Sequence, residues 1–190
     1  MGPQPAGVPA RRLFLVGMMG AGKSSVARSL VARTGWPSVD TDKLVEQAAG
    51  MTVPDLFREA GEDAFRAAES RAVAEAAAMP EPVVVSVGGG AVLRPENRDV
   101  MRVAGTVVWL RARPSTLAVR VGRGEGRPLL AAVGPDSSLE AVLAGISASR
   151  DSLYQEAAML VIDVDGLSAA QTADAVLAQL RARQVGSAPS

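Results

Sequence analysis

Residues 13–24 read LFLVGMMGAGKS, an apolar run that passes directly into a glycine-rich turn. Gly17 and Gly22 stand five residues apart and are followed by Lys23 and Ser24, which is the P-loop pattern. Beyond the turn, apolar residues at 26, 27, 30 and 31 follow helical spacing. A strand entering the turn and a helix leaving it point backbone N–H groups and the positive helix end at a polyphosphate. The stretch therefore predicts an α/β fold with a triphosphate site.

Each residue type in this turn suits phosphate binding. The glycines let the backbone approach without Cβ clashes, Lys23 places a charge between the β- and γ-phosphates, and Ser24 ligates Mg²⁺. The alternative is a plain glycine turn, but only two of the 20 basic residues are lysines, and one stands where a compact ammonium suits phosphate. The expected ATP contacts here are Gly17, Gly20, Ala21, Gly22, Lys23, Ser24 and Ser25.

Further apolar runs alternate with longer helical stretches. Because these runs are apolar on both faces, they predict a parallel sheet covered by helices on each side. The fold class is therefore α/β, a three-layer sandwich. Strands are expected at 13–16, 37–39 (the weakest), 83–87, 106–110 and 159–163, and helices at 22–33, 53–60, 63–78, 95–103, 114–121, 138–157 and 168–183.

Glycine and capping residues mark some boundaries of these elements. Gly35 is expected to end the first helix, and Thr52 with Asp55 resembles a capping box at the start of the second. Gly122 to Pro135 contains four Gly and two Pro without periodicity, which is typical of a mobile loop.

The composition excludes several classes of function. With 20 basic and 20 acidic residues and only six aromatics, nothing indicates a partner nucleic acid or a membrane surface. The absence of Cys and His excludes disulfides and the usual zinc ligands, so acid–base chemistry falls to carboxylates. The length predicts one core, with disordered tails at 1–10 and 184–190, in a soluble cytoplasmic enzyme.

Two further motifs follow expected strands, at the edge where open α/β sheets bind ligands. After the second strand comes Asp40-Thr41-Asp42, in which Asp40 could hold the Mg²⁺ shell and Asp42 could orient an acceptor hydroxyl. The alternative is that Asp40 or Thr41 caps a helix starting near residue 43. After the third strand come Gly88, Gly89 and Gly90, which favour close approach by a ligand over a flexible turn. Ser86 precedes them, either as a second metal-shell residue or as a simple strand serine.

These motifs stand in the order that the shikimate kinase family carries them. The P-loop is followed by the Asp-Thr-Asp triplet, Phe-Arg-x-x-Glu at 65–69, the three glycines, Arg-Pro-Leu at 127–129 and an Arg before Leu-Tyr at 150–154. From Arg12 to about Arg181 the chain resembles this family, a group of P-loop kinases. The resemblance implies strand order 2-3-1-4-5 and a single kinase domain over 11–183, with a substrate-binding region at about 41–70 and a lid at about 122–135.

The resemblance also implies roles for single residues. It implies that the carboxylate of shikimate meets Arg66 and Arg150, while hydroxyls meet Asp42 and a backbone N–H of the glycine triplet. It places Arg127 in the lid, where its charge offsets that of the migrating phosphoryl group, and Arg120 against adenine. The implied catalytic residues are Lys23, Asp42 and Arg127; the implied substrate contacts are Asp42, Phe57, Phe65, Arg66, Gly88, Gly89, Gly90 and Arg150; the metal residues are Ser24 and Asp40.

The arginines could also have purely structural roles. Arg66 could be a solvated helix residue paired with Glu62 or Glu69, and Arg150 or Arg120 could be a surface cation. The sequence also departs from the family pattern at Ser152, where a proline is usual, and in its unusually glycine-rich lid.

The resulting hypothesis is in-line transfer of the γ-phosphoryl group from Mg-ATP to the 3-hydroxyl of shikimate by a monomer. Two alternatives stay open. The first is a kinase for another small hydroxy acid such as gluconate, which the two arginines and the glycine triplet disfavour. The second is a nucleotide-binding switch without catalysis, which the joint presence of Lys23, Asp42 and Arg127 disfavours.

Overall fold

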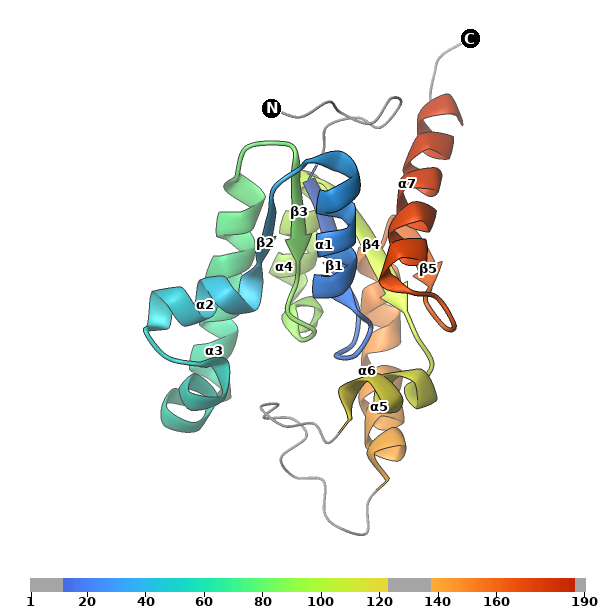
Figure 1. Cartoon of the computed structure of the whole chain (residues 1–190). Helices are drawn as coiled ribbons and strands as arrows, with labels where there is room; N and C mark the ends of the chain where they lie inside the picture. The colour runs from blue at the N-terminus through green and yellow to red at the C-terminus, as the bar shows by residue number, and fades with distance from the viewer. Residues whose placement is uncertain (1–11, 123–137, 187–190) are drawn as a thin grey trace.

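A five-stranded parallel sheet forms the centre of the protein (Figure 1). The computed structural model describes residues 12–122 and 138–186. The strand order is β2-β3-β1-β4-β5, which confirms the order implied by the family resemblance. The strands are β1 (Arg12–Val16), β2 (Ser38–Asp40), β3 (Val83–Ser86), β4 (Thr106–Arg111) and β5 (Leu160–Asp163).

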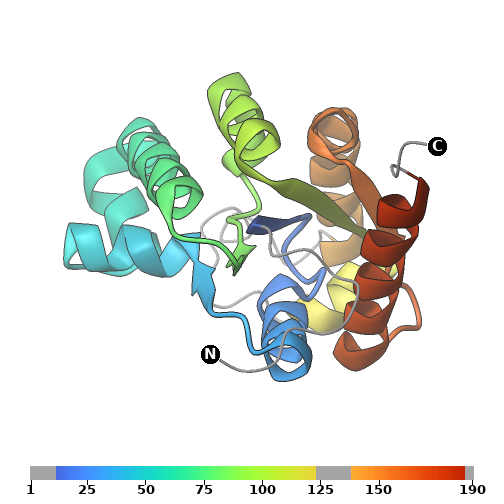
Figure 2. The same ribbon diagram turned by 90° about the horizontal axis from the view of Figure 1, so that it is seen from above.

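Helices cover both faces of this sheet and complete the expected three layers. Seen from above, α1 and α7 lie on one face, and α3, α4 and α6 lie on the other (Figure 2). The helices are α1 (Lys23–Thr34), α2 (Thr41–Ala49), α3 (Val53–Ala78), α4 (Pro95–Ala104), α5 (Pro114–Val121), α6 (Leu139–Ala157) and α7 (Ala169–Gly186), with a short 3-10 turn η1 (Ala91–Leu93).

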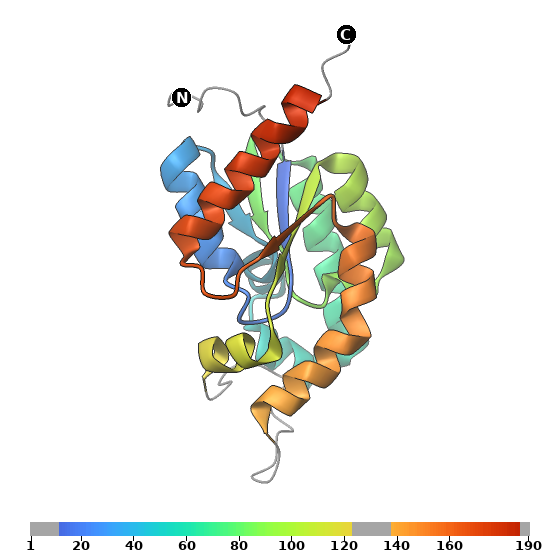
Figure 3. The ribbon, with the colours of Figure 1, turned by 90° about the vertical axis from the view of Figure 1, so that its right-hand side faces the viewer.

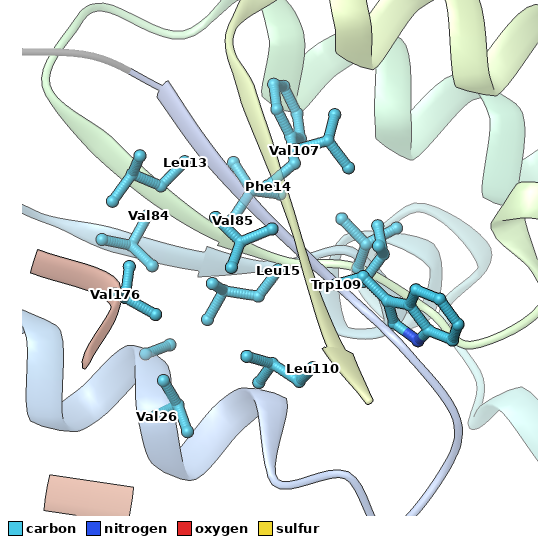
Figure 4. Close-up of a cluster of buried hydrophobic side chains, with 14 of the residues drawn as sticks. Leu13, Phe14, Leu15, Val26, Val84, Val85, Val107, Trp109, Leu110 and Val176 are labelled. Atoms are coloured by element: carbon cyan, nitrogen blue, oxygen red, sulfur yellow. The ribbon is translucent and has the colours of Figure 1, made fainter. Parts of the chain in front are cut away.

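The core forms because β1 is apolar on both faces. Phe14 stands opposite Val85 of β3 and Val107 of β4 in the parallel register. Leu13 and Leu15 point toward α1 and α7, whereas Phe14 points with Val107 to the other face (Figure 4). All of these side chains are fully buried, as expected for a strand covered on both sides.

Helix α3 is divided by a kink, as the sequence predicts. Two helices were expected, at 53–60 and 63–78, and α3 (Val53–Ala78) consists of two helical segments that meet at Gly61. Gly61 interrupts it with φ 82° and ψ 173°, a conformation that glycine adopts without a Cβ penalty. The expected cap at its start is confirmed, because Thr52 Oγ1 accepts a hydrogen bond from the Asp55 N–H at 3.3 Å. The expected break between the two helices is therefore confirmed at Gly61.

The carboxyl ends of the strands meet at one edge of the sheet, and α5 lies across this edge beside the turn between β1 and α1 (Figure 3). A Cβ at Gly20 would lie 2.8 Å from the Val121 side chain and 3.0 Å from the Leu117 carbonyl oxygen, so the turn packs directly on α5. This edge therefore carries the candidate site.

Some predictions fall on residues outside the described ranges. They concern the tail at 1–10, the last four residues of the expected C-terminal tail, and the lid with Arg127, of which only Gly122 is described. Helix α7 extends to Gly186, three residues beyond its expected end. None of the helices within residues 12–122 and 138–186 is both long and apolar enough to cross a bilayer.

Candidate phosphate and acceptor site

The turn between β1 and α1 takes a path that only glycines allow. Gly17 and Gly22 have φ values of 140° and 91°. A Cβ at Gly17 would lie 2.6 Å from the carbonyl oxygen of Leu110 on β4. Gly22 precedes α1, and its carbonyl oxygen accepts the Val26 N–H at 2.8 Å. The N-terminal end of α1 thus faces the loop, where an anion is stabilised.

Lys23 folds back over this turn. Its Nζ donates to the carbonyl oxygen of Gly17 at 2.8 Å and to that of Met18 at 3.2 Å. An ammonium carries three donors on a flexible stem, so it can turn toward phosphate oxygens that enter the loop.

Three oxygen-bearing side chains meet beside the P-loop. Ser24 Oγ donates to Asp40 Oδ2 at 2.9 Å and lies 3.2 Å from Ser86 Oγ. The other oxygen of Asp40 accepts the Asp42 N–H at 3.1 Å and so caps α2. The capping alternative is therefore present, and the other carboxylate oxygen contacts Ser24, so the Mg²⁺ role of Asp40 stays a prediction. Mg²⁺ prefers one or two carboxylates together with waters and phosphate oxygens, and this donor set fits it.

A cavity of about 550 Å³ opens beside these residues. It is bounded by the P-loop, the ends of β2 and β3, and the start of α7. Arg120 closes one side, where its Nη2 donates to the carbonyl oxygens of Val164 at 2.9 Å and Leu167 at 3.0 Å. Its guanidinium thus joins α5 to the loop after β5. Predicted residues that line the cavity are Gly20, Ala21, Gly22, Lys23, Ser24, Ser25, Asp40, Asp42, Ser86 and Arg120.

The glycine loop, Gly88–Gly90, continues from β3 and lies against the Asp-Thr-Asp triplet. The N–H of Gly88 donates to the buried Thr41 Oγ1 at 2.8 Å. A Cβ at Gly88 would lie 2.6 Å from Asp42 Oδ1 and 2.8 Å from Glu69 Oε1. Two carboxylates therefore converge on this glycine, which explains why no larger residue fits there.

Arg66 lies on α3 with its guanidinium against the glycine loop. A Cβ at Gly90 would overlap the guanidinium nitrogens. Nη1 donates to Glu69 Oε2 at 2.8 Å, while Nε and Nη2 donate to Glu62 Oε1 at 3.2 and 3.1 Å. The alternative of a pairing with Glu62 or Glu69 is thus present, and Arg66 pairs with both acids. Arg66 is nevertheless only 6% exposed, so it does not lie on a solvated helix face.

Glu69 is the most deeply buried acid in this cluster, with 1% of its surface exposed. Burial raises the pKa of its carboxyl above the ordinary 4.5, and the nearby negative charge of Asp42 adds to this. The ion pair with Arg66 acts in the opposite direction. Desolvation is the larger effect because the side chain is almost fully removed from water.

Arg150 approaches the glycine loop from α6. It is 6% exposed, and its Nη1 lies 3.4 Å from the Gly89 carbonyl oxygen. The two predicted acceptor-site arginines thus approach the glycine loop from different helices, Arg66 at Gly90 and Arg150 at Gly89. They supply positive charge beside Asp42, as recognition of an acid bearing a hydroxyl requires.

The two phenylalanines form a pair on α3, with ring centroids 5.7 Å apart. Phe65 is 7% exposed and packs in a small apolar cluster with Val45 and Leu56 between α2 and α3. Phe57 packs against this cluster and stays half-buried. Neither ring lines the cavity, so their expected contact with a substrate ring stays a prediction.

Comparison with known proteins places this geometry in a family. The family model for shikimate kinase matches residues 19–181. This chain belongs to the shikimate kinase family. It is 42% identical over 168 residues to shikimate kinase from Cupriavidus pinatubonensis, covering 88% of this chain and 85% of the relative. It is 44% identical over 174 residues to the enzyme from Symbiobacterium thermophilum, covering 90% and 97%.

A solved structure agrees with this assignment. The fold matches shikimate kinase from Acinetobacter baumannii in complex with shikimate with a TM-score of 0.86 and 31% identity, covering 92% of this chain and 95% of the other.

Sequence reasoning about this shikimate kinase family member missed three residues of the site. Thr41 and Tyr154 both bond the glycine loop, and Glu69 was considered only as a possible partner of Arg66. Spacing carried a signal for two of them, because Glu69 stands three residues after Arg66 and Tyr154 stands four after Arg150. The hydroxyl of Thr41 had no such signal beyond its place between two acids.

Proposed function

We propose that this chain transfers the γ-phosphoryl group of ATP to the 3-hydroxyl of shikimate, giving shikimate 3-phosphate and ADP. One observation carries the proposal: Asp42 both lines the phosphate cavity and abuts Gly88, beside the Arg66 cluster. A site for a polyphosphate and a site for an acidic, hydroxylated molecule therefore share a carboxylate. The similarity to the Acinetobacter baumannii protein in complex with shikimate supports the choice of acceptor.

On the donor side, the P-loop N–H groups and Lys23 bind and orient the β- and γ-phosphates. Ser24 and Asp40 would hold Mg²⁺, with Ser86 beside them, 3.2 Å from Ser24. When bound, Mg²⁺ neutralises charge on the phosphate oxygens. Arg120 lines the far side of the cavity, where the nucleotide base is expected.

On the acceptor side, Arg66 and Arg150 bind the carboxylate of shikimate, and Asp42 orients the attacking hydroxyl. As the O–P bond forms, the carboxylate of Asp42 takes the hydroxyl proton. Because little covalent chemistry falls to the protein in phosphoryl transfer, positioning and charge provide most of the rate. Arg127 is proposed to add positive charge from a lid at about 122–135, which lies outside the described residues except for Gly122.

We further propose that residues 11–183 act as one kinase domain and as a monomer, in the cytoplasm. ATP is supplied inside the cell, which supports the location.

Identification of the product tests the proposal. Purified protein is incubated with Mg-ATP and shikimate, and the product is examined by ³¹P and ¹H NMR. We expect a phosphomonoester coupled to the proton on carbon 3. A phosphate on another hydroxyl, or release of inorganic phosphate without transfer, would contradict the proposal.

A further inference from the structure

Tyr154 is a buried phenol that touches the glycine loop from α6. It is 0% exposed, and its hydroxyl donates to the Gly89 carbonyl oxygen at 2.6 Å. Its ring stacks on Trp109 of β4, with centroids 5.6 Å apart and planes 20° apart. Burial raises the pKa of the phenol well above its usual value, while nearby Arg150 acts in the opposite direction, so the hydroxyl keeps the proton that it donates to Gly89.

Gly89 lies where the two halves of the site meet. A Cβ there would lie 3.4 Å from the carbonyl oxygen of Gly17 in the P-loop and 3.9 Å from Lys23 Nζ. On its other side, the carbonyl oxygen faces Tyr154 and Arg150. The peptide after Gly89 therefore separates the phosphate cradle from the guanidinium that is expected to bind the acceptor.

Three successive glycines have no side chains of their own to hold them in place. The loop is instead held by side chains of neighbouring elements. Thr41 accepts the N–H of Gly88 at 2.8 Å, and Tyr154 donates to the carbonyl of Gly89 at 2.6 Å. The contact from Arg150, at 3.4 Å, is longer and belongs to a side chain that must also serve the substrate. Tyr154 is thus the short anchor on the Gly89 carbonyl.

We infer that Tyr154 is a positioning residue for the acceptor: its hydroxyl holds the Gly89 peptide, and through it the acceptor, against Lys23 and the P-loop. The inference rests on the proposed function. It follows because transfer depends on sub-ångström placement of the two substrates, and a glycine loop provides that placement only when it is held from outside.

The variant Tyr154→Phe removes the hydroxyl and keeps the ring that stacks on Trp109. We expect the KM for shikimate to rise about tenfold, the scale of losing one hydrogen bond to a buried carbonyl, while the KM for ATP stays within about twofold. A general loss of packing would instead lower kcat and stability without separating the two KM values. Equal changes in both KM values, or none, would overturn the inference.

Ser147 provides a matched control on the same helix. It is 7% exposed, and its hydroxyl has no hydrogen-bond partner among the described residues. Ser147→Ala therefore deletes a buried hydroxyl from α6 without removing a bond to the loop. Both KM values are expected to stay within about twofold of those of the wild type. A rise in shikimate KM in this control equal to that in Tyr154→Phe would overturn the positioning role.

Hydrogen exchange tests the same role without any substrate. Backbone amides at 87–93 should exchange faster in Tyr154→Phe than in the wild type, while amides in α1 should not change. Equal exchange at 87–93 would overturn the inference. If the wild type fails to phosphorylate shikimate, the proposed function is wrong, and the exchange result still decides whether Tyr154 holds the loop.

Discussion

The side chain of Asp42 lies directly against the glycine loop. A Cβ placed on Gly88 would lie 2.6 Å from Asp42 Oδ1, and the Asp42 side chain also lines the phosphate cavity. A carboxylate there can reach a hydroxyl held next to the γ-phosphate. The backbone N–H of Asp42 is already bonded to Asp40, so the start of α2 holds the residue in place.

The first prediction concerns this carboxylate. Asp42→Asn keeps the shape but removes the base, so kcat should fall by about two to three orders of magnitude while ATP affinity changes less than about threefold. Steady-state kinetics and nucleotide titration measure both. Asp99→Asn, at an exposed acid on α4, is the control and should leave both unchanged. Wild-type turnover in Asp42→Asn would remove the proposed role.

Glu62 pairs with the side of the Arg66 guanidinium that an acidic substrate would need. One of its oxygens accepts from both Nε and Nη2 of Arg66, and its side chain is 53% exposed. Such a half-exposed pair contributes about 1 kcal/mol or less, so it can yield to a substrate carboxylate. Glu62 nevertheless competes with the substrate carboxylate for the guanidinium of Arg66.

Glu62→Gln should therefore lower the KM for shikimate, by about twofold to fivefold, because the competing charge is removed. Initial-rate measurements at saturating ATP report it. Glu59→Gln is the control, since Glu59 pairs with Arg58 rather than with Arg66. A raised KM in Glu62→Gln would mean that Glu62 orients Arg66 instead of competing for it.

Buried Glu69 should make stability depend on pH. Its folded pKa is raised above 4.5, so the folded state binds this proton more tightly than the unfolded state does. The resulting stabilisation is complete below about pH 4.5 and is lost as pH rises through the folded pKa.

Comparison with Glu69→Gln isolates this effect, because other titrating groups largely cancel. The Tm of the variant minus that of the wild type should be more positive at pH 8 than at pH 5. Thermal unfolding followed by circular dichroism gives both values. A difference that stays constant with pH, or becomes more negative, would show that the ion pair with Arg66 outweighs burial.

Helix α3 shows how far local pattern carries a prediction. Its Thr52 cap and the break at Gly61 were both visible in the sequence, and the structure has both the cap and a non-helical residue at Gly61. The two helical segments pack against α2 and α4, so the local signal and the tertiary contacts agree at this point.

Gly61 should be costly to replace for backbone reasons alone. A Cβ there would meet nothing within 4 Å, yet φ 82° with ψ 173° is a region that only glycine populates readily. Gly61→Ala should therefore destabilise the protein by about 1–3 kcal/mol.

Gly145→Ala is the matched control, for which a change in stability of the opposite sign is expected. Gly145 lies within α6, is exposed and has open space around it, so alanine should stabilise the helix by about 0.5–1 kcal/mol. Urea unfolding compares the two variants. Equal shifts in the same direction would contradict the assigned conformation of Gly61.

The phosphate half of the site was predictable because its residues are contiguous. Gly17 to Ser24 form one turn, and this glycine-rich pattern at the end of a buried strand predicts a phosphate-binding site. In the acceptor half, Asp42 was predictable from its place after a strand, whereas Arg66 and Arg150 were predictable only through family resemblance, because they come from α3 and α6. Their convergence on the glycine loop depends on strand order, which local pattern does not encode.

At the scale of the whole molecule, parallel topology brings these parts together. The ends of β1, β2 and β3 meet at one edge, so the P-loop, the Asp-Thr-Asp triplet and the glycine loop become neighbours. Helices from both faces then supply the charged side chains. Under the proposed function, this edge would hold two anionic substrates side by side.

The ratio of kcat/KM for shikimate to that for gluconate, at saturating Mg-ATP, tests the central claim most directly. Buried arginines and carboxylates around the glycine loop should discriminate between these acids, because a poorly fitting one leaves polar groups unpaired. We expect the ratio to exceed about one hundred. A ratio of one or less would contradict the account.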